Sequence, residues 1–172
     1  MPLQALPQGT RIGLDATLFG ISELQSLRKD LVKSGQELVL LDENLVDKIW
    51  QGRPQPSKEA LINHAKYAGE DSSSKIAKVR AIIEENKAHA YVLHDLSEIA
   101  WLLNLRGKDI PFSPVFEAYL LVTLEDATLF LDRDKVGENV LPYLQEELKV
   151  QVRPYEGIWQ GLKDLQANNK KV

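Results

Sequence analysis

The stretch LSEIAWLLNLRGKDIPFSPVFEAYLLVTLEDATLFL, residues 96–131, decides the fold, because it holds a helix, a stiff loop and two strands in succession. Apolar residues recur at helical spacing over residues 96–103, which predicts an amphipathic helix that ends before Arg106. Residues 108–117 form a loop that Pro111 and Pro114 hold stiff. The two apolar runs that follow predict a hairpin, with strands over residues 119–124 and 128–131 and a turn at Glu125 and Asp126.

The rest of the chain after residue 57 continues this alternation of helices and strands. The further predicted elements are a helix over residues 58–66, a break at 67–69, a helix capped by Ser72 or Ser73 that runs through Asn86, a strand over 90–93, a helix over 140–148, a strand over 150–152 and a helix over 157–165. Four strands and five helices favour the α/β class, with one mixed β-sheet flanked by helices.

The first fifty residues predict a smaller unit of the same kind. Its elements are a strand over residues 11–15, a helix that Ser22 caps and Ser34–Gly35 ends, a strand over 37–41 and a short helix over 44–50. Sheets usually have about four to six strands, so a unit with two resembles the C-terminal remnant of a domain. Two prolines then predict an interdomain linker over residues 51–57, followed by a second domain over 58–172.

Composition narrows the classes of partner. The net charge of −4 over 172 residues, without a dense basic run, predicts no nucleic-acid partner. No apolar stretch approaches the roughly 20 residues that span a bilayer, so no membrane partner is expected either. The chain has no cysteine and its first residues do not have the pattern of a signal peptide. We therefore expect a cytoplasmic protein.

Motifs that would carry catalysis are missing from the sequence. The three histidines form no metal-binding pair, and His94–Asp95 is better interpreted as a helix cap at Asp95 beside a partly buried histidine than as a site. The run Ser72–Lys75 fits S-x-x-K, but the other elements that serine acyl-transfer enzymes need do not occur, so we interpret it as a turn and a cap. No catalytic residue and no metal ligand is predicted.

The loop around Arg106 leaves two interpretations open. Prolines and phenylalanines make it stiff, and stiff loops are where binding residues are placed. The plainer interpretation, which spacing alone favours, is a surface ion pair between Arg106 and Asp109, with Phe112 and Phe116 anchored in the core.

Two motifs resemble those of a known family. Residues 99–110, IAWLLNLRGKDI, with PVF at 114–116 and AY at 118–119, are similar to the IAW-x-x-NLRG-x-D-I…NPVF-x-[AS]Y signature of the large three-domain Xaa-Pro aminopeptidases of the creatinase/prolidase superfamily. The upstream segment ENLVDKIW at 43–50, followed by Arg53 and Pro54, resembles the end of the first domain in that family. One departure is Ser113, which stands where the family commonly has asparagine, and it puts any role of that asparagine in doubt.

The resemblance implies the fold of the chain and which domains of the family enzymes are catalytic. Family enzymes have two creatinase N-terminal-like α/β domains and a "pita-bread" catalytic domain, which binds two metal ions, usually manganese, through two Asp, one His and two Glu. By this resemblance residues 1–50 are the end of the first domain, residues 58–172 are the second, and the catalytic domain is absent. The chain is then either an excised piece of a longer protein or the product of a shortened gene. By itself it is expected to be inactive and to carry no cofactor.

The resemblance also implies roles for residues of the loop. The candidates for facing the catalytic domain or its cleft are Asn104, Arg106, Asp109, Pro114 and Phe116. Arg106 would hold a carboxylate or a carbonyl there through its forked donors. The expected function is that of the non-catalytic part of an Xaa-Pro aminopeptidase, which shapes access to the cleft and supports homodimer contacts. The alternative is a stand-alone protein-interaction module of the same superfamily.

Overall fold

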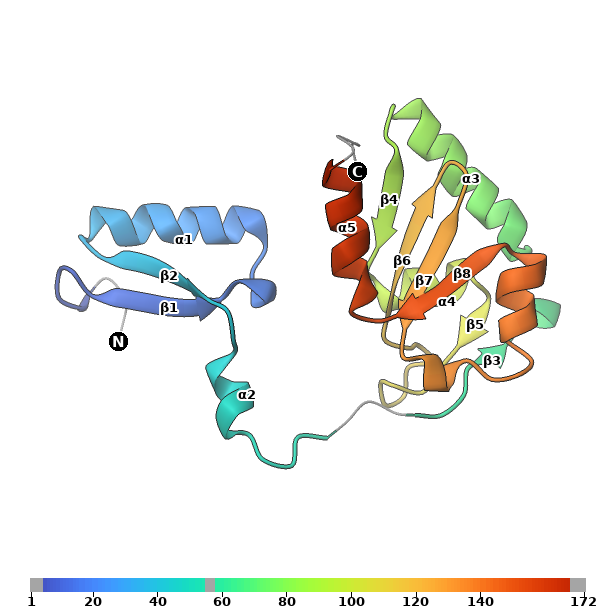
Figure 1. The fold of residues 1–172 in the computed structure, drawn as a ribbon, viewed down its shortest axis with the longest axis horizontal. Coiled ribbons are helices and arrows are strands. Elements are labelled where there is room, and N and C mark those ends of the chain that lie inside the picture. The colour runs from blue at the N-terminus through green and yellow to red at the C-terminus, as the bar shows by residue number, and fades with distance from the viewer. Residues whose placement is uncertain (1–4, 55–57, 168–172) are drawn as a thin grey trace. The chain divides into compact units, whose positions relative to one another are not determined.

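The computed structural model describes residues 5–54 and 58–167, and the chain divides into two compact units, residues 1–54 and 55–172 (Figure 1). The division falls within the predicted linker, of which residues 55–57 lie outside the described part. We call the two units unit 1 and unit 2 and describe each by itself.

Unit 1 is a strand–helix–strand unit followed by a short helix. Strands β1 (Arg11–Asp15) and β2 (Glu37–Leu41) pair in parallel, with Arg11 opposite Glu37, and α1 (Ile21–Lys33) connects them. The short helix α2 (Leu45–Ile49) begins after Asn44, whose side-chain oxygen accepts a hydrogen bond from the Val46 N–H. These elements were predicted from the sequence, and the structure has all four of them.

The N-terminal cap of α1 was predicted wrongly. The helix begins at Ile21 after Gly20, which makes no side-chain capping bond, so Ser22 lies inside the first turn. Its other end follows the prediction, since Ser34 ends the helix and Gly35 has a left-handed φ of 71°.

Unit 2 is built on a four-stranded mixed sheet. Its strands are ordered β4 (Ala90–Leu93), β6 (Ala118–Thr123), β7 (Ala127–Leu131) and β8 (Val150–Pro154). β6 pairs antiparallel with both β4 and β7, and β8 pairs in parallel with β7. This confirms the predicted fold class, a mixed sheet with flanking helices.

Helices cover both faces of this sheet (Figure 1). On one face, residues of α3 (Ser72–Glu85) and α4 (Leu96–Leu102) share a core with alternate residues of β6 and β7. On the other face, α5 (Gly157–Ala167) packs through Ile158 and Leu165 against Leu121 and Phe130. The alternation of strand side chains between two covered faces explains why β6 and β7 are almost continuously apolar.

Residues 58–66 do not form the predicted helix. Residues 58–61 have no regular secondary structure, and β3 (Ile62–Asn63) pairs antiparallel with the short strand β5 (Leu105–Arg106) before a 3₁₀ turn at Ala65–Tyr67. The reason is tertiary: the Leu61 N–H donates to the Lys135 carbonyl at 2.8 Å, and the Leu61 side chain is buried. The helical propensity of this segment is weak, and the tertiary contacts of Leu61 outweigh it.

Two further details differ from the predictions. Asp71, and neither Ser72 nor Ser73, caps α3, because its side chain accepts a hydrogen bond from the Ser74 N–H at 2.8 Å. The helix predicted over residues 140–148 contains a wide π-helical turn at Tyr143–Glu147. None of the described helices is long and apolar enough to cross a membrane.

Candidate functional site

The loop that follows α4 begins at a buried asparagine. Asn104 has a left-handed φ of 51°, a conformation that asparagine tolerates better than most residues. Its side-chain oxygen accepts a hydrogen bond from Lys75 Nζ at 2.6 Å, and its side-chain nitrogen donates to the Glu70 carbonyl at 3.0 Å. Its own carbonyl accepts from the His64 N–H at 2.9 Å. Asn104 therefore ties three segments together where the loop leaves the helix.

Lys75 is the second buried anchor of this loop. Its side chain, in a residue only 3% exposed, donates to the Trp101 carbonyl at 2.6 Å and lies 4.4 Å from the centre of the Trp101 ring. Burial lowers the pKa of Lys75, while the nearby Glu70 carboxylate opposes that shift. The other end of the S-x-x-K run, Ser72, shares a hydrogen bond of 2.8 Å with the Tyr143 hydroxyl. The run thus supports the loop, but it lies in the first turn of α3, so its interpretation as a turn and a cap is wrong.

Arg106 comes next, on β5, and is only half-buried. Its Nη1 donates to the carbonyls of Ala100 at 3.0 Å and Leu105 at 2.8 Å, which fix the direction of the guanidinium. Within residues 5–54 and 58–167 no carboxylate forms an ion pair with it. The predicted surface pair between Arg106 and Asp109 is therefore wrong.

Asp109 instead forms a buried ion pair with Lys135. The two side-chain atoms are 2.5 Å apart, and the side chains are 1% and 2% exposed. The same Asp109 oxygen accepts from the Glu117 N–H at 2.6 Å. This pair closes the far end of the loop, because Lys135 belongs to the segment after β7.

The two phenylalanines of the loop behave differently. Phe116 is completely buried and packs against Gly107, where an added Cβ would lie 2.6 Å from the Phe116 Cβ. Phe112 has a left-handed φ of 63° and an exposed fraction of 109%, so its predicted place in the core is wrong. The loop is thus anchored inward at Phe116 and presents an aromatic side chain outward at Phe112.

A groove of about 630 Å³ lies along this loop and β3. We call it the Arg106 groove. Of the five candidate residues, Arg106 and Pro114 line it, whereas the side chains of Asn104, Asp109 and Phe116 are buried and hold the loop in place. That these residues face a catalytic domain stays a prediction. Apart from Arg106 and Pro114, the lining residues are Glu59, Ile62, His64, Gly107, Lys108, Ile110, Pro111, Phe112 and Ser113.

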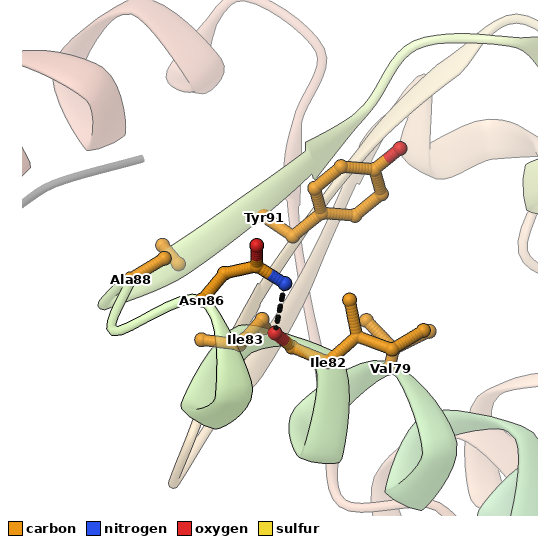
Figure 2. Close-up of a pocket in the computed structure, with 7 residues that line it drawn as sticks. Val79, Ile82, Ile83, Asn86, Ala88 and Tyr91 are labelled. Atoms are coloured by element: carbon orange, nitrogen blue, oxygen red, sulfur yellow. Dashed lines mark hydrogen bonds between the residues drawn. The ribbon is translucent and has the colours of Figure 1, made fainter.

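A second cavity, of about 450 Å³, lies between the end of α3 and β4 (Figure 2). The ring of Tyr91 stands across from Ile82 and Val79, and Asn86 donates to the Ile82 carbonyl at 2.9 Å. The described residues that line it include no carboxylate, imidazole or ammonium group, so it has no evident catalytic chemistry.

A third hollow, in unit 1, contains several carboxylates at the carboxyl ends of β1 and β2. Hydrogen bonds from Thr17 and Asn44 lower the pKa of Asp15, and Asp47 pairs with Arg53. Across the part of the chain that the structure describes, no three His, Asp or Glu side chains are grouped so as to hold a metal ion.

The interpretation of His94–Asp95 as a cap is confirmed. Asp95 accepts hydrogen bonds from the backbone N–H groups of Glu98 and Ser97, and these bonds lower the pKa of its carboxyl group. His94 is exposed, so the prediction that it is partly buried is wrong.

Sequence reasoning missed the two buried lysines that support the loop. For Lys75 a signal exists, because it shares a helical face with Val79 and Ile83, where a solvated lysine is out of place. For Lys135 no local signal exists, since its partner Asp109 lies 26 residues away.

The comparisons with known proteins agree with this architecture. A sequence profile of the creatinase/prolidase N-terminal domain matches residues 52–172. The chain belongs to this family. The match covers the whole of the described part of unit 2 and therefore includes the Arg106 groove.

Relatives of this creatinase/prolidase N-terminal domain are aminopeptidases. A probable Xaa-Pro aminopeptidase P of Pyricularia oryzae is 42% identical over 88% of the chain, and aminopeptidase P2 of Arabidopsis thaliana is 41% identical over 97% of it. The crystal structure of an X-prolyl aminopeptidase of Caenorhabditis elegans, described as a cytosolic enzyme with a di-nuclear active site, covers 96% of the chain with a TM-score of 0.83 and 29% identity.

These relatives are much longer than this chain. It spans 25% of the Pyricularia protein, 24% of the Arabidopsis protein and 28% of the Caenorhabditis chain. The likeness therefore concerns about a quarter of each relative.

Proposed function

We propose that this creatinase/prolidase N-terminal domain acts as the non-catalytic portion of a cytoplasmic Xaa-Pro aminopeptidase. The parent enzyme would remove an N-terminal residue that precedes proline. The observation that carries this proposal is the 41% identity to aminopeptidase P2 over 97% of the chain, since it extends through both units rather than one motif. The Caenorhabditis relative, a cytosolic enzyme, supports the cytoplasmic location.

The catalytic chemistry would reside in a separate domain of the parent enzyme. In this proposal that domain holds two manganese ions, which would polarise the scissile carbonyl and activate water. The described residues of this chain do not fit such a metal centre, because no three suitable ligands are grouped. In this proposal the chain shapes access to the cleft and supports homodimer contacts.

The 104–116 loop is suited to face a catalytic domain. It is held at both ends by buried polar contacts, Lys75 with Asn104 and Lys135 with Asp109. It presents Arg106 and the fully exposed Phe112 on its outer side. A preorganised binding surface needs exposed groups on a backbone that is held rigid, and this loop has both.

A segment exchange tests the proposal. The region of Arabidopsis aminopeptidase P2 that matches this chain is replaced by residues 1–172, and hydrolysis of an Xaa-Pro-Pro peptide is measured with Mn²⁺. We expect turnover by the exchanged enzyme and none by the 172-residue chain alone. The unmodified aminopeptidase P2 is the positive control.

Two outcomes would contradict the proposal. Turnover by the isolated chain would show that it carries catalysis itself. An exchanged enzyme that is folded by circular dichroism and binds manganese, yet has no activity, would favour the stand-alone interaction module.

A further inference from the structure

The guanidinium of Arg106 is oriented but not neutralised. Carbonyls of Ala100 and Leu105 hold its Nη1, and no carboxylate of the described residues pairs with it. Arginine offers five N–H donors in a planar fork that matches a carboxylate. A half-buried arginine that lines a groove and keeps part of this fork available is suited to an anionic ligand.

The other charges of the Arg106 groove do not cancel this cation. Lys108 and Glu59, which also line the groove, are 2.5 Å apart and form an ion pair with each other. The backbone N–H of the remaining titratable residue, His64, donates to Asn104, and its ring lies 5.6 Å from that of Tyr67. The groove therefore has one uncompensated positive charge, that of Arg106, among the described residues.

Its walls are apolar and more exposed than such residues usually are. Ile62 is 47% exposed, Ile110 is 41% exposed and Phe112 is fully exposed, with Pro111 and Pro114 beside them. Aromatic and proline side chains around a groove are a recurring surface for extended, proline-containing peptides. Such peptides keep little conformational freedom in solution and so lose little on binding.

We propose that the Arg106 groove binds the downstream end of a proline-containing peptide substrate, with Arg106 holding the terminal carboxylate. The inference rests on the proposed function, because it takes the substrate to be an Xaa-Pro peptide. It deepens that function by assigning this non-catalytic unit a share in substrate selection. A carboxylate side chain of the adjoining catalytic domain is the competing occupant, and the test separates the two.

The first experiment uses the 172-residue chain and two probes that differ in one group. Ala-Pro-Pro-Ala as the free acid and as its C-terminal amide are titrated separately, and backbone amide shifts are followed by NMR. We expect the free acid to shift the signals of Ile62, Gly107 and Phe112. The amide should bind roughly tenfold more weakly or worse, because it forfeits a charge-assisted, two-point contact.

Two variants identify the residue responsible. Arg106→Gln should bring the free acid down to the affinity of the amide, while the circular dichroism spectrum stays unchanged. Arg153→Gln removes the same charge from an exposed position on β8 and should change neither affinity. Equal binding of acid and amide by the unmodified chain would overturn the proposal, and so would an Arg106→Gln variant that still distinguishes them.

The exchanged aminopeptidase P2 separates this inference from the proposed function. If that enzyme is active, we expect a lower KM for free acids than for amides, and Arg106→Gln should abolish the difference with little change in kcat. An active enzyme that does not distinguish acid from amide contradicts the inference and leaves the proposed function standing. If Arg106→Gln lowers its thermal stability without altering that KM ratio, Arg106 binds the catalytic domain instead, and the inference is wrong.

Discussion

Both units alternate strands and helices along the chain, but unit 2 buries many more apolar side chains than unit 1. Within residues 5–54 the buried apolar side chains are Leu31 and Leu38, whereas unit 2 has a continuous core on both faces of its sheet. Apolar residues of unit 1 such as Ile21 and Ile49 are 77% and 78% exposed. The comparison shows that local signals are enough to specify helices and strands, whereas an extensive core also needs a sheet with enough covering helices to bury its apolar side chains.

The largest expected effect comes from separating the units. Residues 55–172 alone should unfold cooperatively at nearly the temperature of the whole chain, because their core is self-contained. Residues 1–54 alone should show no cooperative transition, since a two-stranded sheet with one covering helix is too small to be stable. Differential scanning calorimetry of the two pieces checks this. A sharp transition of the smaller piece would contradict the comparison.

The next effect tests the buried ion pair of unit 2, which has no counterpart among the described residues of unit 1. Lys135→Met should cost about 3–5 kcal/mol of unfolding free energy, because it leaves the Asp109 carboxylate buried without its partner. Denaturant unfolding followed by circular dichroism measures it.

Its matched control is the exposed pair of the same loop. Lys108→Met removes the partner of Glu59, and both side chains are well exposed, so it should cost about 0–1 kcal/mol. Adding Asp109→Asn to Lys135→Met should recover part of the loss. Equal costs for the two lysine variants would show that burial does not strengthen the contact.

A smaller effect tests how tightly the loop packs. Gly107→Ala would bring a Cβ to 2.6 Å from the Phe116 Cβ and 2.9 Å from the Val115 carbonyl, and should cost about 1–3 kcal/mol by overpacking. Gly137→Ala is the control, because its nearest neighbour would be Ala60 Cβ at an ordinary 3.6 Å. Equal unfolding temperatures for the two variants would mean that the loop accommodates the added methyl group without a loss of stability.

The smallest effect concerns acid, and it compares the units directly. Hydrogen bonds, chiefly from Thr17 to Asp15 and from Glu98 to Asp95, lower both pKa values below 3.8. Each carboxylate therefore adds stability that is present above the unfolded pKa and is lost as pH falls through the folded pKa. Asn still accepts a capping hydrogen bond but does not titrate.

Unfolding measured from neutral pH down to pH about 3 checks this expectation. Asp15→Asn and Asp95→Asn should each flatten the acid dependence of unfolding of the whole chain. A variant whose loss of stability on acidification equals that of the unmodified chain would show that its carboxylate contributes nothing.

The sequence predicted the elements whose signals are local. The strands at 11–15 and 37–41, the hairpin after the loop and the Asp95 cap all depend on neighbours in the chain, and the structure has them. The helix predicted over residues 58–66 failed because Leu61 and Ile62 take partners about 74 and 44 positions away, which no local pattern encodes.

The candidate site was predictable in place but not in detail. The motif around Arg106 marked the right loop, yet spacing alone favoured an ion pair between Arg106 and Asp109. In the structure Asp109 forms its ion pair with Lys135, because a buried carboxylate needs a cation that is buried with it. Which phenylalanine points inward also depends on packing, here on the close approach of Phe116 to Gly107.

The placement of the three tryptophans makes the two units optically distinguishable. Trp50 ends α2 in unit 1, whereas Trp101 and Trp159 belong to α4 and α5 in unit 2. The Lys75 ammonium lies 4.4 Å from the centre of the Trp101 ring, and a charge this close to an indole shifts the wavelength of its fluorescence emission. Replacing Trp159 by Phe would leave one emitter in each unit. The emission of Trp101 would then follow the opening of the loop anchor in real time, while Trp50 follows unit 1.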